Sequence, residues 1–63
     1  MSLQIWLLIR IAYIEAVLQK AGEAMLLFTL VGDHEGQMLA AKTIFQADRA
    51  LQFYQNLLEA FDF

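Results

Sequence analysis

The sequence predicts an all-α protein, an antiparallel hairpin of two helices at about residues 3–31 and 33–61. The chain has 63 residues and no proline, so nothing in its composition interrupts a long helix. The strongest turn signal, Gly32-Asp33-His34-Glu35-Gly36, lies near the middle of the chain. The two flanking arms are equally long, about 42 Å each at the α-helical rise of about 1.5 Å per residue. We expect a single helical-hairpin domain over residues 1–63.

The first arm, about residues 3–31, is apolar around most of its circumference. On a helical wheel its main stripe consists of Leu3, Trp6, Leu7, Tyr13, Ile14, Val17, Leu18, Ala21, Ala24, Met25, Phe28 and Val31. A second apolar set points elsewhere and consists of Ile5, Leu8, Ile9, Ala12, Ala16, Leu26, Leu27 and Leu30. A helix that is apolar on several sides is covered on several sides, by protein or by lipid.

A β-strand interpretation competes in this arm. Residues 3–14 and 25–31 are rich in β-branched and aromatic side chains, and Gly22 is a potential break before a strand at 25–31. The intervening sequence EAVLQKAGEAM is rich in helix formers, which favours one helix. The pattern alone leaves open whether that helix is continuous through Gly22.

The turn carries its own capping residues. We expect Gly32 to take the left-handed conformation that ends a helix, and Asp33 to cap the next helix through its carboxylate. Gly36 completes this glycine-flanked turn, and Glu35 suits the positive end of the following helix dipole.

The second arm, about residues 33–61, is amphipathic. Its apolar face consists of Leu39, Ala40, Thr43, Ile44, Ala47, Ala50, Leu51, Tyr54, Leu57, Leu58 and Phe61. Met38 and Phe45 project from the opposite, polar side. Exposed methionine and aromatic side chains suit an adaptable contact surface, so these two are candidate partner-binding residues.

A chain this short normally needs a disulfide, a metal or a partner subunit to fold stably. The sequence has no cysteine and one histidine, which leaves a partner. Because the second arm can cover only one face of the first, we expect the second apolar set to form an oligomer interface. The simplest closed assembly is a homodimeric four-helix bundle with the first arm central, and a higher helical oligomer is the alternative. Folding and dimerisation would then be one event.

The sequence contains no constellation that supports catalysis, a metal or another cofactor. The cluster Asp33-His34-Glu35 lies in the turn, where capping explains its carboxylates, and no nucleophile accompanies His34. Four Lys and Arg against seven Asp and Glu disfavour nucleic-acid binding. We therefore expect a protein that is not an enzyme.

The charged residues also bear on location. Arg10, Glu15, Lys20 and Glu23 divide the first arm, which disfavours a transmembrane helix. No basic region precedes the apolar N-terminus, so we expect a cytoplasmic protein, with membrane association as the alternative.

The sequence thus predicts a homo-oligomeric helical protein that acts through protein–protein interaction, as a small regulator, adaptor or assembly subunit. The alternative is a membrane-associated or apolar-ligand-binding protein that uses the second apolar face of the first arm.

Overall fold

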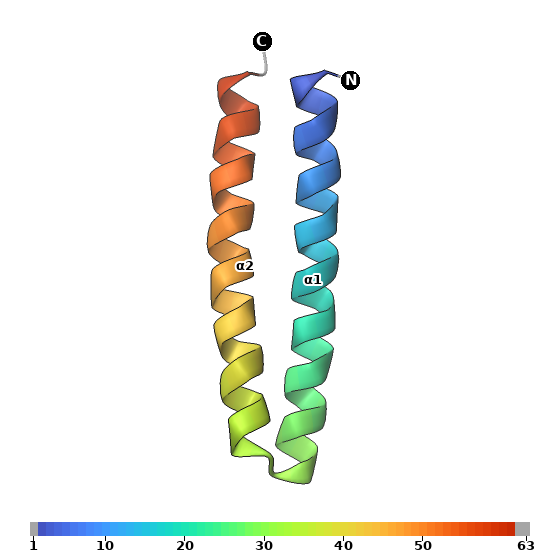
Figure 1. Cartoon of the computed structure of the whole chain (residues 1–63), viewed down its shortest axis with the longest axis vertical. Coiled ribbons are helices and arrows are strands. Elements are labelled where there is room, and N and C mark those ends of the chain that lie inside the picture. The colour runs from blue at the N-terminus through green and yellow to red at the C-terminus, as the bar shows by residue number, and fades with distance from the viewer. Residues whose placement is uncertain (1, 62–63) are drawn as a thin grey trace.

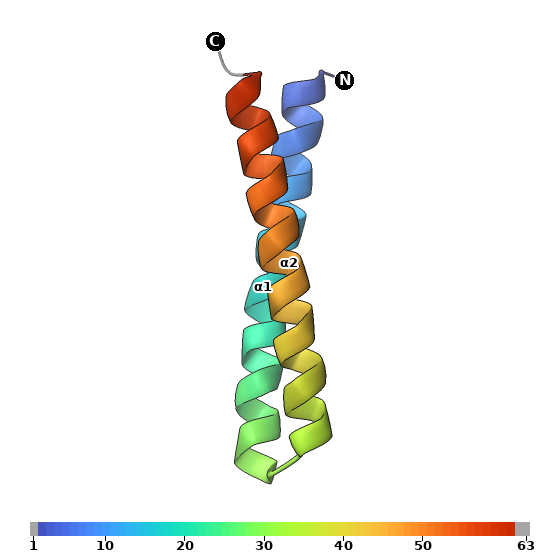
Figure 2. The same ribbon diagram turned by 90° about the vertical axis from the view of Figure 1, so that its left-hand side faces the viewer.

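The computed structural model describes residues 2–61 and contains two α-helices, α1 (Leu3–Val31) and α2 (His34–Ala60). They run antiparallel and side by side over their whole length, with both chain ends at the same end of the molecule (Figure 1). The second view shows that they cross at a shallow angle (Figure 2). The molecule is 47 Å long and 13 to 16 Å wide. The predicted helical hairpin is confirmed, with each helix boundary within one residue of its expected position.

Helix α1 is one continuous helix of 29 residues. It begins at the N-cap Ser2, whose hydroxyl accepts a hydrogen bond from the backbone N–H of Ile5 at 3.2 Å. It passes through Gly22 without a break, and a Cβ added at this glycine would meet no atom within 4 Å. The alternative of a strand at 25–31 is therefore wrong.

The turn between the helices is closed by backbone hydrogen bonds. Gly32 has φ 73° and ψ 25°, the left-handed conformation that glycine adopts without steric cost. Its N–H donates to the carbonyl of Thr29 at 3.2 Å, and the N–H of Asp33 donates to the carbonyl of Phe28 at 2.9 Å. This is the Schellman arrangement that satisfies the last carbonyls of a helix.

Helix α2 starts directly after this motif. The Asp33 carboxylate caps it by accepting a hydrogen bond from the N–H of Gly36 at 3.0 Å. Gly36 is buried against the ring of Phe28, and a Cβ at this position would lie 2.6 Å from Cγ of that ring. The glycine therefore lets the two helices approach closely beside the turn.

The contact between the helices is narrow. On α1 the buried residues are Leu7, Ile11, Ile14 and Ala21, and they face Gly36, Ala40 and the half-buried residues of α2. Leu7 is the one large side chain, among the residues described, that solvent does not reach at all. The main stripe assigned from the sequence contains three of these four α1 residues but omits Ile11, which is a miss.

Some residues assigned to the apolar stripes are exposed instead. Tyr13, Val31 and Leu39 remain 63 to 76 % accessible although the wheel placed them on the contact face. The stripe on α1 is wider than the strip that one neighbouring helix can cover, so only its central residues become buried. The hairpin therefore leaves most of its apolar side chains in contact with solvent.

Hydrogen bonds fix the register at both ends of the hairpin. At the open end, Nε2 of Gln4 donates to the carbonyl of Phe61 at 2.8 Å. At the turn, Nε2 of Gln37 donates to Oγ1 of Thr29 at 2.8 Å, and that hydroxyl donates to the carbonyl of Met25. Residues that face each other thus lie at nearly equal distances along the chain from Asp33.

Candidate interaction surface

A group of eight exposed apolar residues lies on α1, on the side away from α2. It consists of the second apolar set found in the sequence, here called the outer face: Ile5, Leu8, Ile9, Ala12, Ala16, Leu26, Leu27 and Leu30. All eight residues are exposed, and the six large ones are 52 to 80 % accessible. Exposed large apolar side chains in this number on one side of a helix are characteristic of an interaction site.

The large apolar residues of the outer face form two clusters, and a segment with small and polar side chains lies between them. One cluster lies near the N-terminus of α1, at Ile5, Leu8 and Ile9, and the other near the turn, at Leu26, Leu27 and Leu30. Between them the exposed surface carries Ala12 and Ala16, followed by Gln19 and Glu23. Between the two apolar clusters, two small side chains are therefore followed along α1 by two long polar ones.

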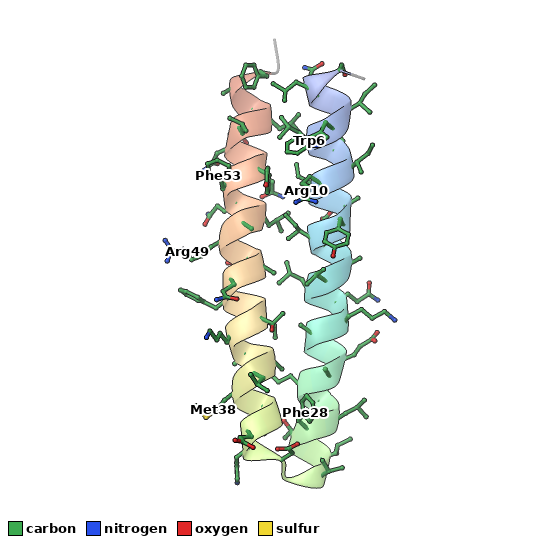
Figure 3. The ribbon with its side chains drawn as sticks, viewed as in Figure 1. Trp6, Arg10, Phe28, Met38, Arg49 and Phe53 are labelled. Atoms are coloured by element: carbon green, nitrogen blue, oxygen red, sulfur yellow. The ribbon has the colours of Figure 1, made fainter. Side chains whose placement is uncertain are left out.

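Helix α2 carries four exposed large apolar residues, Met38, Leu39, Phe45 and Phe53, of which Met38 and Phe45 are the two assigned from the sequence to its polar side. Met38 is 74 % accessible and Phe45 is 61 % accessible. The guanidinium carbon of Arg49 lies 5.6 Å from the centre of the Phe45 ring, within cation–π range. Met38 and Arg49 both project from the side of α2 that faces away from α1 (Figure 3). The candidate partner-binding residues are thus separated from the outer face by the thickness of the hairpin.

A groove of about 480 Å³ runs along one side of the hairpin between the helices, a feature that the sequence did not reveal. Its lining is almost wholly apolar and consists of Tyr13, Ala16, Val17, Lys20, Ala21, Ala24, Phe28, Leu39, Ala40 and Thr43. Four alanines lie on its walls and floor, so the groove exists because short side chains face each other across the two helices. Its volume is within the range of small-molecule sites.

An aromatic cluster lies near the open end. The rings of Trp6 and Tyr54 meet edge to face, with centroids 6.0 Å apart. Arg10 lies within 6.0 Å of the ring centres of both Trp6 and Tyr13. Trp6 and Arg10 both project toward the space between the helices (Figure 3). Arg10, a charge within the apolar stripe, is accommodated by these rings and remains exposed to water.

The polar cluster at the turn is a structural element. Asp33 caps α2, and Nδ1 of His34 lies 3.1 Å from Oε1 of Gln37, whose amide nitrogen reaches Thr29 across the turn. Within residues 2–61 no three His, Cys, Asp or Glu side chains gather in a geometry that would hold a metal ion. These side chains therefore cap α2 and connect its first turn to α1.

Neither helix, over the part of the chain that the structure describes, is long and apolar enough to cross a membrane. In comparisons with protein-family models, curated proteins and solved structures, nothing matches this chain. The candidate interaction surface is therefore identified solely from which residues of this chain are exposed.

Proposed function

We propose that this protein is a non-enzymatic helical hairpin that self-associates and acts through protein–protein contacts, as a small regulator, adaptor or assembly subunit. The observation that carries the proposal is the outer face of α1, where six leucine and isoleucine side chains are more than half exposed. A second chain of the same sequence can cover this face, because the partner offers an equivalent apolar surface.

The small core supports the need for a partner. Among residues 2–61, five apolar residues are buried, Leu7, Ile11, Ile14, Ala21 and Ala40, and two of them are alanines. Full burial of one leucine or isoleucine stabilises a fold by about 1.5–3 kcal/mol. Covering the six large residues of the outer face would therefore bury twice as many large apolar side chains as the three that the hairpin buries by itself.

The position of the outer face also indicates the form of the assembly. It lies on the side of α1 opposite the buried residues that contact α2, so a partner bound there makes α1 the central helix. Two hairpins joined through α1 would give a homodimer of four helices, with each α2 on the outside. The Met38–Phe45 surface would stay open in that dimer, whereas the groove would border the contact at Ala16.

Size-exclusion chromatography with light scattering, with and without detergent, tests the proposal. We expect the mass of two or more chains in buffer without detergent at micromolar concentration. A folded monomer that persists into the low micromolar range would contradict self-association. An assembly that requires detergent or co-sediments with liposomes would instead support the membrane-associated alternative.

Two leucines provide a matched control for the location of the interface. Leu27, on the outer face, and Leu39, on α2 beside the groove, are 63 % and 67 % accessible. We expect Leu27→Gln to weaken the dimer at least about tenfold, because a glutamine amide would be buried against apolar side chains. Leu39→Gln should leave the dissociation constant within about twofold, since single surface substitutions have small effects. The reverse result would place the interface at the groove.

We further propose that Met38 and Phe45 form a second contact surface, for another protein. Phe53 is a control of equal exposure on the same helix, because both phenylalanines are 61 % accessible. Phe45→Ala should abolish capture of a partner by the immobilised protein, whereas Phe53→Ala should retain it. Equal capture by the two variants would remove Phe45 from the binding surface.

The groove supports a second candidate function, the binding of an apolar ligand. An apolar lining with Lys20 and Tyr13 as polar-tipped side chains fits a small hydrophobic molecule. Native mass spectrometry of the purified protein tests this candidate through the mass of any bound compound. A spectrum that contains only unliganded chains would count against it.

A further inference from the structure

Two chains that self-associate through the outer face, the proposed function on which this inference rests, can pair in a parallel or an antiparallel orientation. The residues nearest the centre of that face follow each other at alternating intervals of four and three positions. We call them the outer seam: Ile5, Ile9, Ala12, Ala16, Gln19, Glu23, Leu26 and Leu30. All eight are exposed to solvent in the single chain. This spacing is the one with which two α-helices pack along a common line.

The midpoint of the outer seam lies between Val17 and Leu18. When a second copy runs in the opposite direction, the side chains of each half of the seam complement in size those of the other half on the second copy. In an antiparallel pair, Ile5 faces Leu30 of the second copy, and Ile9 faces its Leu26. In the centre, the short side chain of Ala12 faces the long Glu23, and Ala16 faces Gln19. Every layer of an antiparallel seam therefore combines either two large apolar residues or one small and one long residue.

A parallel pair would place each residue opposite itself. Ala12 and Ala16 would then form two thin layers, while Gln19 and Glu23 would form two thick ones, so no single separation of the helices would suit all layers. The two Glu23 carboxylates would also meet in the contact, and like charges in apposition oppose association. The parallel pair would bring Glu15 beside Lys20 of the other chain, but an exposed ion pair contributes little.

We infer that the second copy of this chain binds the outer face of α1 in the antiparallel orientation, with Ala12 of each chain opposite Glu23 of the other. The alanine gives the carboxylate room to extend to the solvent at the edge of the contact. Glu23 then acts as an orientation-determining residue, because only the antiparallel pair separates the two carboxylates.

Cysteine cross-linking tests the orientation cleanly, because the natural chain contains no cysteine. In the antiparallel pair, position 9 of one chain adjoins position 26 of the other, within reach of a disulfide. The two copies of position 9 lie about 25 Å apart along the axis at a rise of 1.5 Å per residue, too far for a disulfide. We expect a mixture of the I9C and L26C variants to give the mixed covalent dimer in a glutathione buffer, and each variant alone to stay uncrosslinked. Q52C, on α2, is the control for random collisions.

Charge substitution at position 12 gives a second, independent readout. In the antiparallel pair Ala12→Lys places a cation opposite Glu23, whereas Ala12→Glu places a second carboxylate there. We expect A12K to dimerise at least about tenfold more tightly than A12E. In a parallel pair both variants would face themselves and weaken the dimer alike.

The outcomes separate this inference from the proposed function. A dimer in which I9C cross-links with itself, and in which A12K and A12E behave alike, would overturn the antiparallel orientation and leave self-association intact. A chain that remains monomeric would overturn both. The mixed I9C–L26C dimer, together with tighter association of A12K, is the result that the antiparallel orientation predicts.

Discussion

The two sides of α1 have similar composition and different surroundings. The inner side buries Leu7, Ile11, Ile14 and Ala21 against α2. The outer face carries six large apolar residues, against three on the inner side, and leaves them in water. The comparison teaches that hydrophobicity alone does not define the core of this chain. The position of α2 decides which side is inside, and the other side is available for a partner.

This difference predicts two kinds of stability. Contacts on the inner side belong to one chain, so their contribution does not depend on protein concentration. Contacts on the outer face would belong to two chains, and their contribution would grow with concentration by mass action. Leu7 belongs to the inner side and Leu8, its neighbour in the sequence, belongs to the outer face. The two leucines are therefore a matched pair for substitution.

The largest effect is expected for Leu7→Ala. Leu7 is fully buried, and replacing such a leucine with alanine removes apolar contacts and leaves a cavity, at a cost of about 2–5 kcal/mol. Thermal unfolding followed by circular dichroism should show a lower Tm at every protein concentration. A Tm within a degree or two of the natural chain would contradict the placement of Leu7 in the core.

Leu8→Ala is expected to act through association. Leu8 is 53 % exposed in the hairpin, and we expect it to lose up to about 1.5–3 kcal/mol of apolar burial per chain at the dimer contact. The concentration at which half of the chains are associated should rise at least about tenfold, because both chains lose apolar burial at the contact. An unchanged dissociation constant would place Leu8 outside any interface.

Gly36→Ala tests the close approach of the helices beside the turn. The new methyl group would overlap the ring of Phe28, so the ring or the helix must shift, at a cost of about 1–3 kcal/mol. Gly22→Ala is the control, because nothing lies within 4 Å of a Cβ at that position. It should stabilise α1 by about 0.5–1 kcal/mol through helix propensity. Equal effects of the two substitutions on chemical unfolding would refute the contact with Phe28.

The smallest of these effects is expected for Asp33→Ala. Its carboxylate is the N-cap of α2, and loss of such a cap costs about 1 kcal/mol. Asp33→Asn retains an acceptor oxygen and should keep most of the stability. Chemical denaturation measures the contribution of the capping hydrogen bond as the difference between the free energies of unfolding of the two variants. Identical denaturation midpoints would argue against this hydrogen bond.

Much of this fold follows from the sequence. The absence of proline and the central turn signal were enough to predict two long helices and their boundaries. The helical wheel also separated the outer face from most of the core. Ile11 was missed although it lies four residues after Leu7 and seven before Leu18, spacings that share one face of a helix. The roles of Ser2 as a cap and of Gly36 as a point of close approach depend on local geometry. The groove likewise arises from alanines far apart in the sequence, so no local pattern announces it.

The most direct test of the central claim is a dilution series in which mass and helicity are measured on the same samples, by light scattering and circular dichroism. We predict that the mass falls from the oligomer toward one chain and that the helical signal falls with it, because the outer face and the small core stabilise the fold together. A single chain that keeps its full helical signal at the lowest concentration would show that the hairpin is stable alone. That result would contradict the claim that the outer face of α1 is an interface on which folding depends.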